Sequence, residues 1–433
     1  MSPLVRRVIA SLGANAFAQA ANVTMQLLSL PLFLHQWNAA TYGTWLMLSA
    51  IPAYLSMADV GMVNTAGNRM TMAMGQGDTA LANRVFQSAQ VFMMVACAVM
   101  AVVALPAVML APIPGLSNVD ERTALAALTS GVLMLLYSGL SDAMFRATGR
   151  YALGTTLSNV LRLCEWGFGL LGLYLWGTFS AVAWMSLAMR VVGLIGLGWM
   201  ASRDAQGLTW GVRDARWAEV RAMTRPALSF MMFPLTNALT FQGSTLLVGH
   251  LLGPAMVTVF NTYRTLARVA VQLTGVFSFA LWAEFSRLYG KGGAEAVVGL
   301  YKRSTRLGSL MAVGLSVVLY LAGPLLLRLW THGAIAYDGR LMVILLAYAA
   351  AGGIQHVSRV MLMAVNQHMG LAQWALGSAV FMLVLGAGLA ASMGVAGVSL
   401  AMLLAEALMT TVCLVLAHRL LHPAPAAGQE SVA

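Results

Sequence analysis

Charged side chains are scarce in this sequence. Only 9% of its 433 residues are Asp, Glu, Lys or Arg, whereas 60% are hydrophobic and the mean hydropathy is +0.78. A soluble domain carries roughly a quarter charged residues, so this composition excludes an ordinary soluble protein. Apolar runs of about 20 residues predict membrane-spanning helices, because irregular backbone cannot satisfy its polar groups in lipid. We therefore expect an all-α, polytopic membrane protein.

Cysteine is rare, and the usual catalytic patterns are missing. Cys97, Cys164 and Cys413 lie in apolar runs without paired spacing, so neither a disulfide framework nor a zinc site is expected. The sequence has no Gly-rich phosphate loop with Lys and no metal-spaced His/Cys cluster. It also has no Ser/His/Asp arrangement outside the expected spans. We expect a protein that is not an enzyme and needs no cofactor or metal.

Basic residues outnumber acidic ones, and their positions are informative. The net charge of +11 would suggest nucleic acid in a soluble protein, but most of these residues fall in loops on one side of the expected spans. Arg122 and Arg340 lie on the other side, with Arg328 near a helix end. This is the positive-inside pattern. It predicts that both termini are cytoplasmic and that the protein does not bind nucleic acid.

The apolar runs predict about twelve spanning helices in two groups of six. The first group covers 8–34, 43–66, 85–111, 123–147, 151–176 and 178–201, and the second covers 226–252, 256–282, 304–330, 341–365, 371–392 and 395–418. Between them lies a polar, arginine-rich stretch that we interpret as a hinge. The expected domains are a six-helix bundle at 1–202, a cytoplasmic amphipathic linker at 203–225, a second bundle at 226–418 and a cytoplasmic tail at 419–433.

The two halves look like copies of one unit. A shift of 215 positions places His35 on His250 and superimposes the loop GQGD on GKGG. Because each half has an even number of spans, both copies would enter the membrane in the same direction, as parallel repeats do.

Amide side chains form a stripe on the first expected helix. Asn15, Gln19, Asn22 and Gln26 recur every three or four residues, which puts them on one helix face. Two interpretations stay open. The amides hold helix to helix, or they line a water-filled cavity and bind sugar hydroxyls.

Arginines outnumber acids within the expected spans. Arg264 and Arg268 share one helix face, and their forked guanidinium groups suit a phosphate or pyrophosphate. Alternatively, they lie near the cytoplasmic end or pair with acids of other helices. Arg162 and Glu165 are spaced to form an ion pair. Together with Arg190 and Arg359, the arginines exceed Glu165 and Glu406, so we expect a net positive cavity and an anionic substrate.

Short motifs resemble a known transporter family. Tyr42-Gly43, Asp59-Val60-Gly61 and Arg69 resemble the polysaccharide and O-antigen flippases of the multidrug/oligosaccharidyl-lipid/polysaccharide exporter superfamily. In the second half, LLGPAMVTVFNTYRTLARV is similar to the family's eighth helix and FSRLYGKGG to the loop after it. One departure is Ala283, where the family pattern has a proline, and another is the short C-terminal tail.

The resemblance implies a flippase of the cytoplasmic (inner) membrane. Its two bundles would surround a central cavity and move a polyprenyl-pyrophosphate-linked oligosaccharide by alternating access, for cell-surface polysaccharide such as the O-antigen of lipopolysaccharide. Its partners would be this substrate, membrane lipids and the polysaccharide polymerase or ligase machinery. Arg264, Arg268, Arg359 and Arg162 are the expected anion-binding residues. Asp59 with Arg69 would lock the end of the second helix.

Two alternatives remain. A cation-coupled multidrug exporter of the same superfamily would need an intramembrane acid, and the first expected helix has none. A membrane-embedded glycan polymerase or ligase would display charged residues in a large outward loop, but the longest outward loops, PIPGLSNVDER and THGAIAYDGR, are short.

Overall fold

The computed structural model describes residues 3–59, 61–110, 118–203, 205, 207–365 and 369–421. The prediction of an all-α fold is confirmed, since all regular elements in these ranges are helices and no strand occurs among them. The chain forms two compact units, Met1–Ala238 and Leu239–Ala433. The linker expected at 203–225 therefore lies within the first unit.

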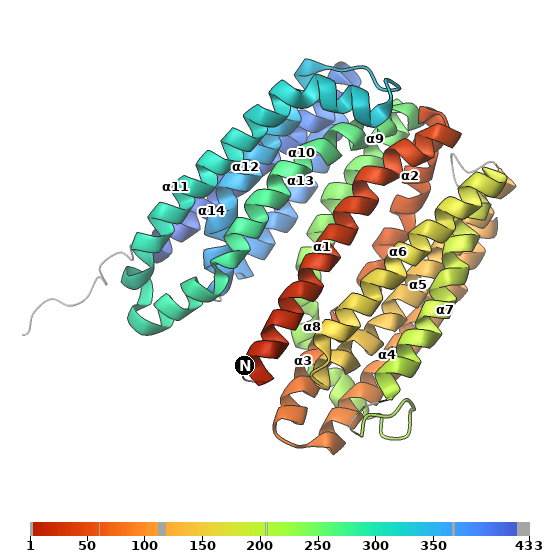
Figure 1. Cartoon of the computed structure of the whole chain (residues 1–433), viewed down its shortest axis with the longest axis vertical. Coiled ribbons are helices and arrows are strands. Elements are labelled where there is room, and N and C mark those ends of the chain that lie inside the picture. The colour runs from red at the N-terminus through yellow and green to blue at the C-terminus, as the bar shows by residue number, and fades with distance from the viewer. Residues whose placement is uncertain are drawn as a thin grey trace, which may run out of the picture. The chain divides into compact units, whose positions relative to one another are not determined.

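Figure 1 shows the helices of each unit running alongside one another. The first unit contains α1 (Pro3–Gln36), α2 (Ala39–Ala53), the 3-10 helix η1 (Tyr54–Asp59), α3 (Met62–Gly75), α4 (Thr79–Leu110), α5 (Val119–Ala147), α6 (Tyr151–Trp176), α7 (Phe179–Ser202) and α8 (Trp217–Ala238). The second contains the π-helix η2 (Leu239–Gly243), α9 (Ser244–Leu252), α10 (Pro254–Ala280), α11 (Trp282–Thr331), α12 (Gly339–Ala364), α13 (Met369–Met393) and α14 (Val395–Leu421).

Each expected span corresponds to helix in the structure, but two spans are interrupted. The span at 43–66 breaks into α2, η1 and α3, and Gly61 precedes α3 with φ +76°. This left-handed conformation suits glycine because it has no Cβ. The span at 226–252 is divided by the π-helix η2. His35 and His250, which the expected repeat superimposes, both lie in the last turn of a helix, α1 and α9 respectively.

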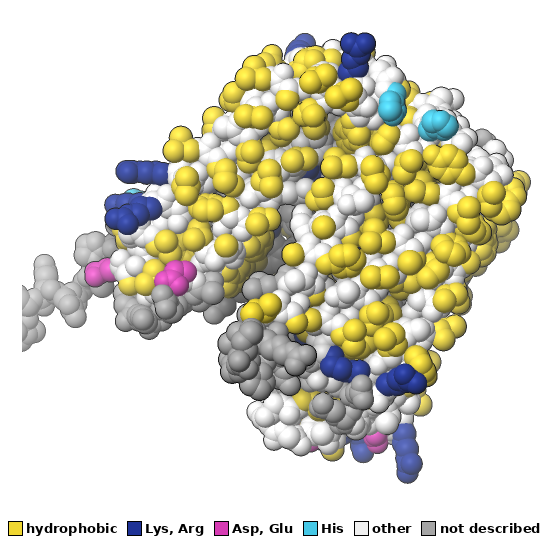
Figure 2. Space-filling view, viewed as in Figure 1, with side chains coloured by type: hydrophobic (Ala, Val, Ile, Leu, Met, Phe, Trp, Pro, Cys, Tyr) yellow, Lys and Arg dark blue, Asp and Glu magenta, His cyan; other side chains and the backbone are white. Residues whose placement is uncertain are grey.

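The outer surfaces of the helices are apolar. Among the described residues, eight helices are long and apolar enough to cross a membrane, and they lie at Ile9–Gln36, Thr79–Leu110, Val119–Ala147, Phe179–Ser202, Gly293–Thr331, Gly339–Ala364, Gly370–Met393 and Val395–Leu421. Only 11% of the α4 window is buried inside the protein, so its apolar side chains need a lipid environment. Figure 2 shows these side chains over the sides of the first unit, with Lys and Arg at the end where the linker lies. The chain is a multi-pass membrane protein.

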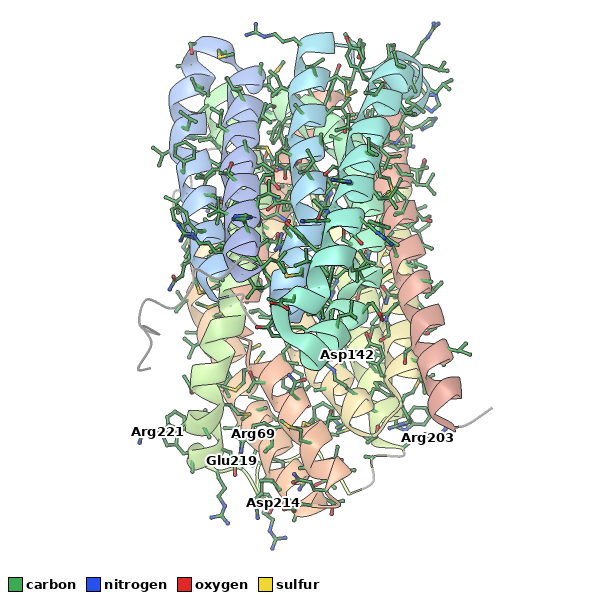
Figure 3. The ribbon with its side chains drawn as sticks, turned by 90° about the vertical axis from the view of Figure 1, so that its left-hand side faces the viewer. Arg69, Asp142, Arg203, Asp214, Glu219 and Arg221 are labelled. Carbon is green, nitrogen blue, oxygen red and sulfur yellow. The ribbon has the colours of Figure 1, made fainter. Side chains whose placement is uncertain are left out.

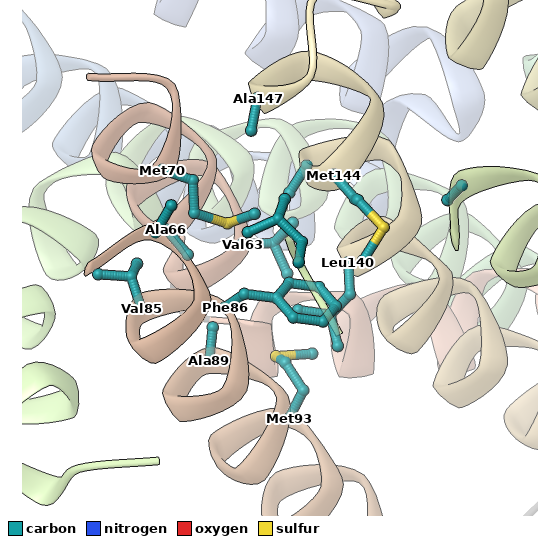
Figure 4. Close-up of a cluster of buried hydrophobic side chains, with 14 of the residues drawn as sticks. Val63, Ala66, Met70, Val85, Phe86, Ala89, Met93, Leu140, Met144 and Ala147 are labelled. Carbon is teal, nitrogen blue, oxygen red and sulfur yellow. The ribbon is translucent and has the colours of Figure 1, made fainter. Parts of the chain in front are cut away.

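The core of the first unit is built by three helices near the linker. Met62 and Met70 of α3, Phe86 of α4 and Met144 and Phe145 of α5 are fully or almost fully buried and pack into one cluster (Figure 4). Leu208 of the linker and Val220 and Met223 of α8 belong to the same cluster. The apolar side chains of the linker thus fasten it to the bundle.

Buried amides of α4 hold the linker more specifically. Asn83 accepts a hydrogen bond from the Thr209 amide at 2.8 Å, and Gln90 accepts one from the Gly211 amide at 3.1 Å. Gln87 donates to the Thr209 carbonyl at 3.1 Å and accepts from the Asp214 amide at 2.7 Å. Side chains at steps of three and four lie on one helix face, so α4 offers the irregular linker a row of partners. The linker that we interpreted as a hinge is docked on α4 from Thr209 to Arg216.

This docking gives a test of the linker. Replacing Gln87 with Ala leaves the Asp214 amide without its buried partner, which should lower the free energy of unfolding by about 1–3 kcal/mol. Trypsin should also cleave faster after Arg213 or Arg216, as followed by gel electrophoresis of the purified protein. The matched control is Gln76→Ala, because Gln76 is exposed at the end of α3. Equal cleavage rates in the two variants would contradict the docking.

Candidate functional site

A polar cavity lies inside the membrane-spanning part of the first unit. It has a volume of about 320 Å³ and is enclosed by α5, α6 and α7. Charged or hydrogen-bonding side chains line much of it, namely Ser138, Asp142, Arg146, Tyr151, Thr155, Ser158, Asn159, Arg162, Glu165 and Arg190. Ionisable groups are expensive within a bilayer and usually mark a transport or proton pathway, so this cavity is the first candidate site.

Three helices each contribute charge to the cavity. Arg190 of α7 forms an ion pair with the buried Glu165 of α6 and donates a hydrogen bond to the Gly131 carbonyl of α5 at 3.3 Å. The sequence spacing predicted Arg162 as the ion-pair partner of Glu165. Arg162 instead is exposed to the cavity and interacts with Glu165 and Arg190 only electrostatically. Among the described residues Arg162 makes no hydrogen bond.

The second acid of the cavity is Asp142 on α5. It accepts a hydrogen bond from Ser158 of α6 at 2.7 Å. Arg146, four residues further along α5, interacts with Asp142 electrostatically but forms no salt bridge with it at contact distance. The Nε atom of Arg146 is buried without a hydrogen-bond partner in the part of the chain that the structure describes. The cavity therefore combines two carboxyl groups with three guanidinium groups, and not all of their hydrogen bonds are formed.

The amide stripe of α1 lies beside this bundle. Asn15 accepts a hydrogen bond at 3.1 Å from Tyr151, which itself lines the cavity. Gln19 is exposed, whereas Asn22 and Gln26 are half-buried. Packing of α1 on α6 is also fixed by Trp166, whose indole donates to Ser29 at 2.9 Å. Of the two interpretations of the stripe, Asn15 supports helix-to-helix contact, while the exposed Gln19 remains available to a ligand.

A second polar cluster, in the second unit, is centred on Arg264. Its guanidinium group donates to the Phe241 carbonyl at 2.9 Å, to Ser244 at 2.7 Å, to Thr245 at 2.9 Å and to Asn261. The aromatic rings of Phe241 and Phe260 lie 5.4 and 4.8 Å from it. A π-helix lacks the regular i→i−4 bonds of an α-helix, and here Arg264 uses one of the carbonyls in η2. Arg264, only 7% exposed, thus joins α10 to η2 and α9.

Arg268 lies one turn away and is held differently. Its guanidinium group stacks over the Phe241 ring at 4.6 Å. Within the described residues it makes no hydrogen bond and no ion pair. The pair that the sequence analysis assigned to one anion therefore divides into Arg264, whose donors are occupied by the protein, and Arg268, which keeps free donors.

Arg359 belongs to a further cluster between α12 and α14. It interacts electrostatically with Glu406, whose carboxylate accepts a hydrogen bond from Gln355. Cys413 donates to the other end of the Gln355 amide at 3.1 Å. The acid that seemed alone in the sequence is thus part of a network, and Arg359 is one of its members.

Arg69, which we expected to pair with Asp59 at the end of the second span, has a different partner. Arg69 forms an ion pair of 2.7 Å with Glu219 of α8 (Figure 3). The side chain of Asp59, its expected partner, lies outside the described residues. No group of three or more His, Cys, Asp or Glu side chains that could hold a metal occurs in the part of the chain described.

Arg264 and Arg268 offer a matched comparison. Arg264→Met leaves four acceptors without this donor, two of them on the buried residues Ser244 and Thr245, so the free energy of unfolding should fall by at least about 2 kcal/mol. Arg268→Met removes one stacking contact and should change it by less than about 1 kcal/mol. Both values can be measured by denaturant titration of the purified protein in detergent. Equal losses in the two variants would show that Arg264 does not hold η2 to α10.

Comparison with known proteins identifies the fold. No protein-family model and no curated protein sequence matches the chain. Among solved structures, an inward-facing multidrug resistance MATE family transporter of the MOP superfamily aligns with a TM-score of 0.73 at 15% identity, covering 92% of this chain and 94% of that one. An outward-facing one gives 0.64 at 12% identity, with coverages of 95% and 94%. A MATE structure in the straight conformation gives 0.62 at 14%, with coverages of 96% and 94%. The chain has the fold of MATE transporters over almost its whole length.

Proposed function

We propose that this protein is a secondary transporter that exports small molecules by alternating access and is driven by a cation, in the manner of a multidrug exporter. The fold supports this proposal, because the matching MATE structures include both inward-facing and outward-facing conformations. The observation that carries it is the cavity with two carboxyl groups, Glu165 and Asp142, inside the first bundle.

The sequence argument against an exporter was that the first helix has no acid. The structure puts acids on α5 and α6 instead, and both face one cavity. A coupling site needs a carboxylate within the membrane that can exchange one cationic partner for another. Glu165 is our candidate for this role, because it already has a cationic partner in Arg190 and lines the cavity.

Coupling would then work through this ion pair. With a carboxylate at Glu165, Arg190 holds α7 to α6. When a proton neutralises Glu165, the half-buried guanidinium group loses its counter-charge, and an arrangement with a different environment for Arg190 becomes more favourable. A ligand shifts such an equilibrium only by its difference in affinity for the two states. The proposal therefore requires Glu165 to bind a proton more tightly in the arrangement where Arg190 has left it.

Glu165→Gln tests the proposal directly. The amide cannot ionise, so export of a cationic dye such as ethidium from cells that express the variant should fall to the level of cells without the protein. Glu295→Gln is the matched control, since Glu295 is an exposed acid on α11. Membrane expression of both variants is compared by immunoblot. Normal export by correctly expressed Glu165→Gln would remove this residue from the coupling site.

A second candidate is a flippase for a polyprenyl-pyrophosphate-linked oligosaccharide in the cytoplasmic membrane, acting with a polysaccharide polymerase or ligase. The specific observation in its favour is Arg268 on α10, a guanidinium group that stacks on Phe241 and for which no hydrogen bond or ion pair occurs among the described residues. Such a group suits a pyrophosphate. The excess of arginine in the first cavity agrees with an anionic head group.

Deleting the gene separates the two candidates. For the exporter, cells should become more sensitive to cationic dyes while surface glycan stays unchanged. For the flippase, undecaprenyl-linked oligosaccharide should accumulate on the cytoplasmic leaflet and surface glycan should be lost. In that case a gene encoding Arg268→Ala should fail to restore surface glycan to the deletion strain. Normal surface glycan in cells that express this variant would remove Arg268 from the site.

A further inference from the structure

A second cavity of the first unit lies at the end of the bundle nearest the linker. It has a volume of about 330 Å³, separate from the charged cavity, and lies between α5 and α7 with Trp210 of the linker against it. Its lining is aromatic and aliphatic, with three hydroxyl groups, and consists of Tyr137, Ser141, Leu194, Ile195, Gly198, Trp199, Ser202 and Trp210. We call it the α5–α7 groove.

One polar atom in the groove lacks a partner. Ser141 is completely buried, and its hydroxyl makes no hydrogen bond within the described part of the chain. The neighbouring polar groups are already paired. Trp210 donates to Ser202 at 2.8 Å, and the Tyr137 hydroxyl accepts from Gln90 at 3.2 Å. Buried hydroxyl groups in proteins are nearly always hydrogen-bonded, so Ser141 points to a ligand that carries an acceptor.

The rim of the groove carries a positive charge. The guanidinium group of Arg203 stacks over the Trp199 ring at 4.0 Å, directly after the last turn of α7. Arg203 is exposed, and none of the described carboxylates forms an ion pair with it. Stacking fixes the plane of the guanidinium group and leaves its donors free for an anion.

The groove also lies at a particular depth in the membrane. The spanning helix α7 ends at Ser202, within the same turn as Trp199 and beside Arg203. Tryptophan and arginine are typical of the boundary between hydrocarbon and lipid head groups. On the outward side of α7, Ile195 and Trp199 are 68% and 56% exposed, so the groove opens toward lipid.

We propose that the α5–α7 groove binds one phospholipid with an anionic head group. The phosphate pairs with Arg203, an ester carbonyl accepts the hydrogen bond of Ser141, and the first part of an acyl chain packs on Leu194 and Ile195. The occupant is a lipid because the groove is apolar, opens toward the bilayer and has its cation at head-group depth. Since Trp210 belongs to the docked linker, the bound lipid stabilises that docking. The proposal does not depend on what the protein transports.

The groove can be filled by a substitution that replaces none of its polar side chains. A Cβ at Gly198 would lie 3.9 Å from the Trp210 ring and 4.0 Å from the Ser141 hydroxyl, which are ordinary contact distances. Gly198→Ala is therefore tolerated, whereas the longer side chain of Gly198→Leu fills the groove. Arg203→Ala removes the cation, and Arg213→Ala removes an equally exposed arginine of the linker that is not part of the groove.

The test is native mass spectrometry of the purified full chain in detergent, titrated with phosphatidylglycerol or phosphatidylcholine. The wild-type protein, Gly198→Ala and Arg213→Ala should each retain one phosphatidylglycerol. In Gly198→Leu and Arg203→Ala the affinity for it should fall about tenfold or more, as expected for the loss of a charge-assisted contact. Phosphatidylcholine should bind more weakly than phosphatidylglycerol, because its choline group offsets the charge of the phosphate. Its affinity should therefore fall less in Arg203→Ala than that of phosphatidylglycerol.

The opposite results would overturn the proposal. Equal retention of lipid by the wild type and by Gly198→Leu would indicate annular lipid only. Displacement of phosphatidylglycerol by ethidium, but not by other lipids, would assign the groove to a transported molecule instead. Melting temperature monitors folding, and if Gly198→Leu does not fold, Ser141→Ala replaces it. Unchanged affinity in both Ser141→Ala and Arg203→Ala would likewise rule out the site.

Discussion

The structure depends on how ionised groups are accommodated inside helices that otherwise face lipid. A buried charge is destabilising unless it is paired or fully hydrogen-bonded. In the first unit Arg190 is paired with Glu165, and in the second unit Arg264 is surrounded by neutral oxygen acceptors and aromatic rings. In both cases the guanidinium group joins neighbouring helices, α7 to α6 and α5 in the first unit and α10 to η2 and α9 in the second.

The ion pair of Arg190 and the neutral hydrogen bonds of Arg264 have different consequences for function. The pair of Arg190 and Glu165 depends on the charge of a carboxyl group, so a proton can break it. The acceptors of Arg264 are a carbonyl, two hydroxyls and an amide, none of which titrates, so this contact persists in every protonation state. The proposed coupling therefore involves the first unit, whereas Arg264 positions η2 and α9 against α10. The docked linker fits this division, because the amides of α4 hold it against the unit that contains the cavity.

Much of the fold could be predicted from the sequence, because membrane insertion imposes a length and composition on every span. The interruptions at Gly61 and at η2 could not be predicted, because each depends on local backbone geometry within a continuous apolar run. Among site residues, Arg162 and Glu165 were recognisable as unusual, but their spacing pointed to an ion pair between them on one helix. The observed partner of Glu165 lies on α7, and contacts between helices leave no periodic signal in one sequence. The amides of α4 were missed for the same reason.

The central claim is that Glu165 couples a proton to transport, and proton flux in proteoliposomes tests it most directly. Purified protein is reconstituted with a pH-sensitive dye inside, and ethidium is added as substrate under an imposed pH gradient. Substrate-dependent proton movement by the wild type, and none by Glu165→Gln, is the result that the account predicts. Equal proton movement by both proteins would contradict it, because the carboxyl group of Glu165 would then have no part in coupling.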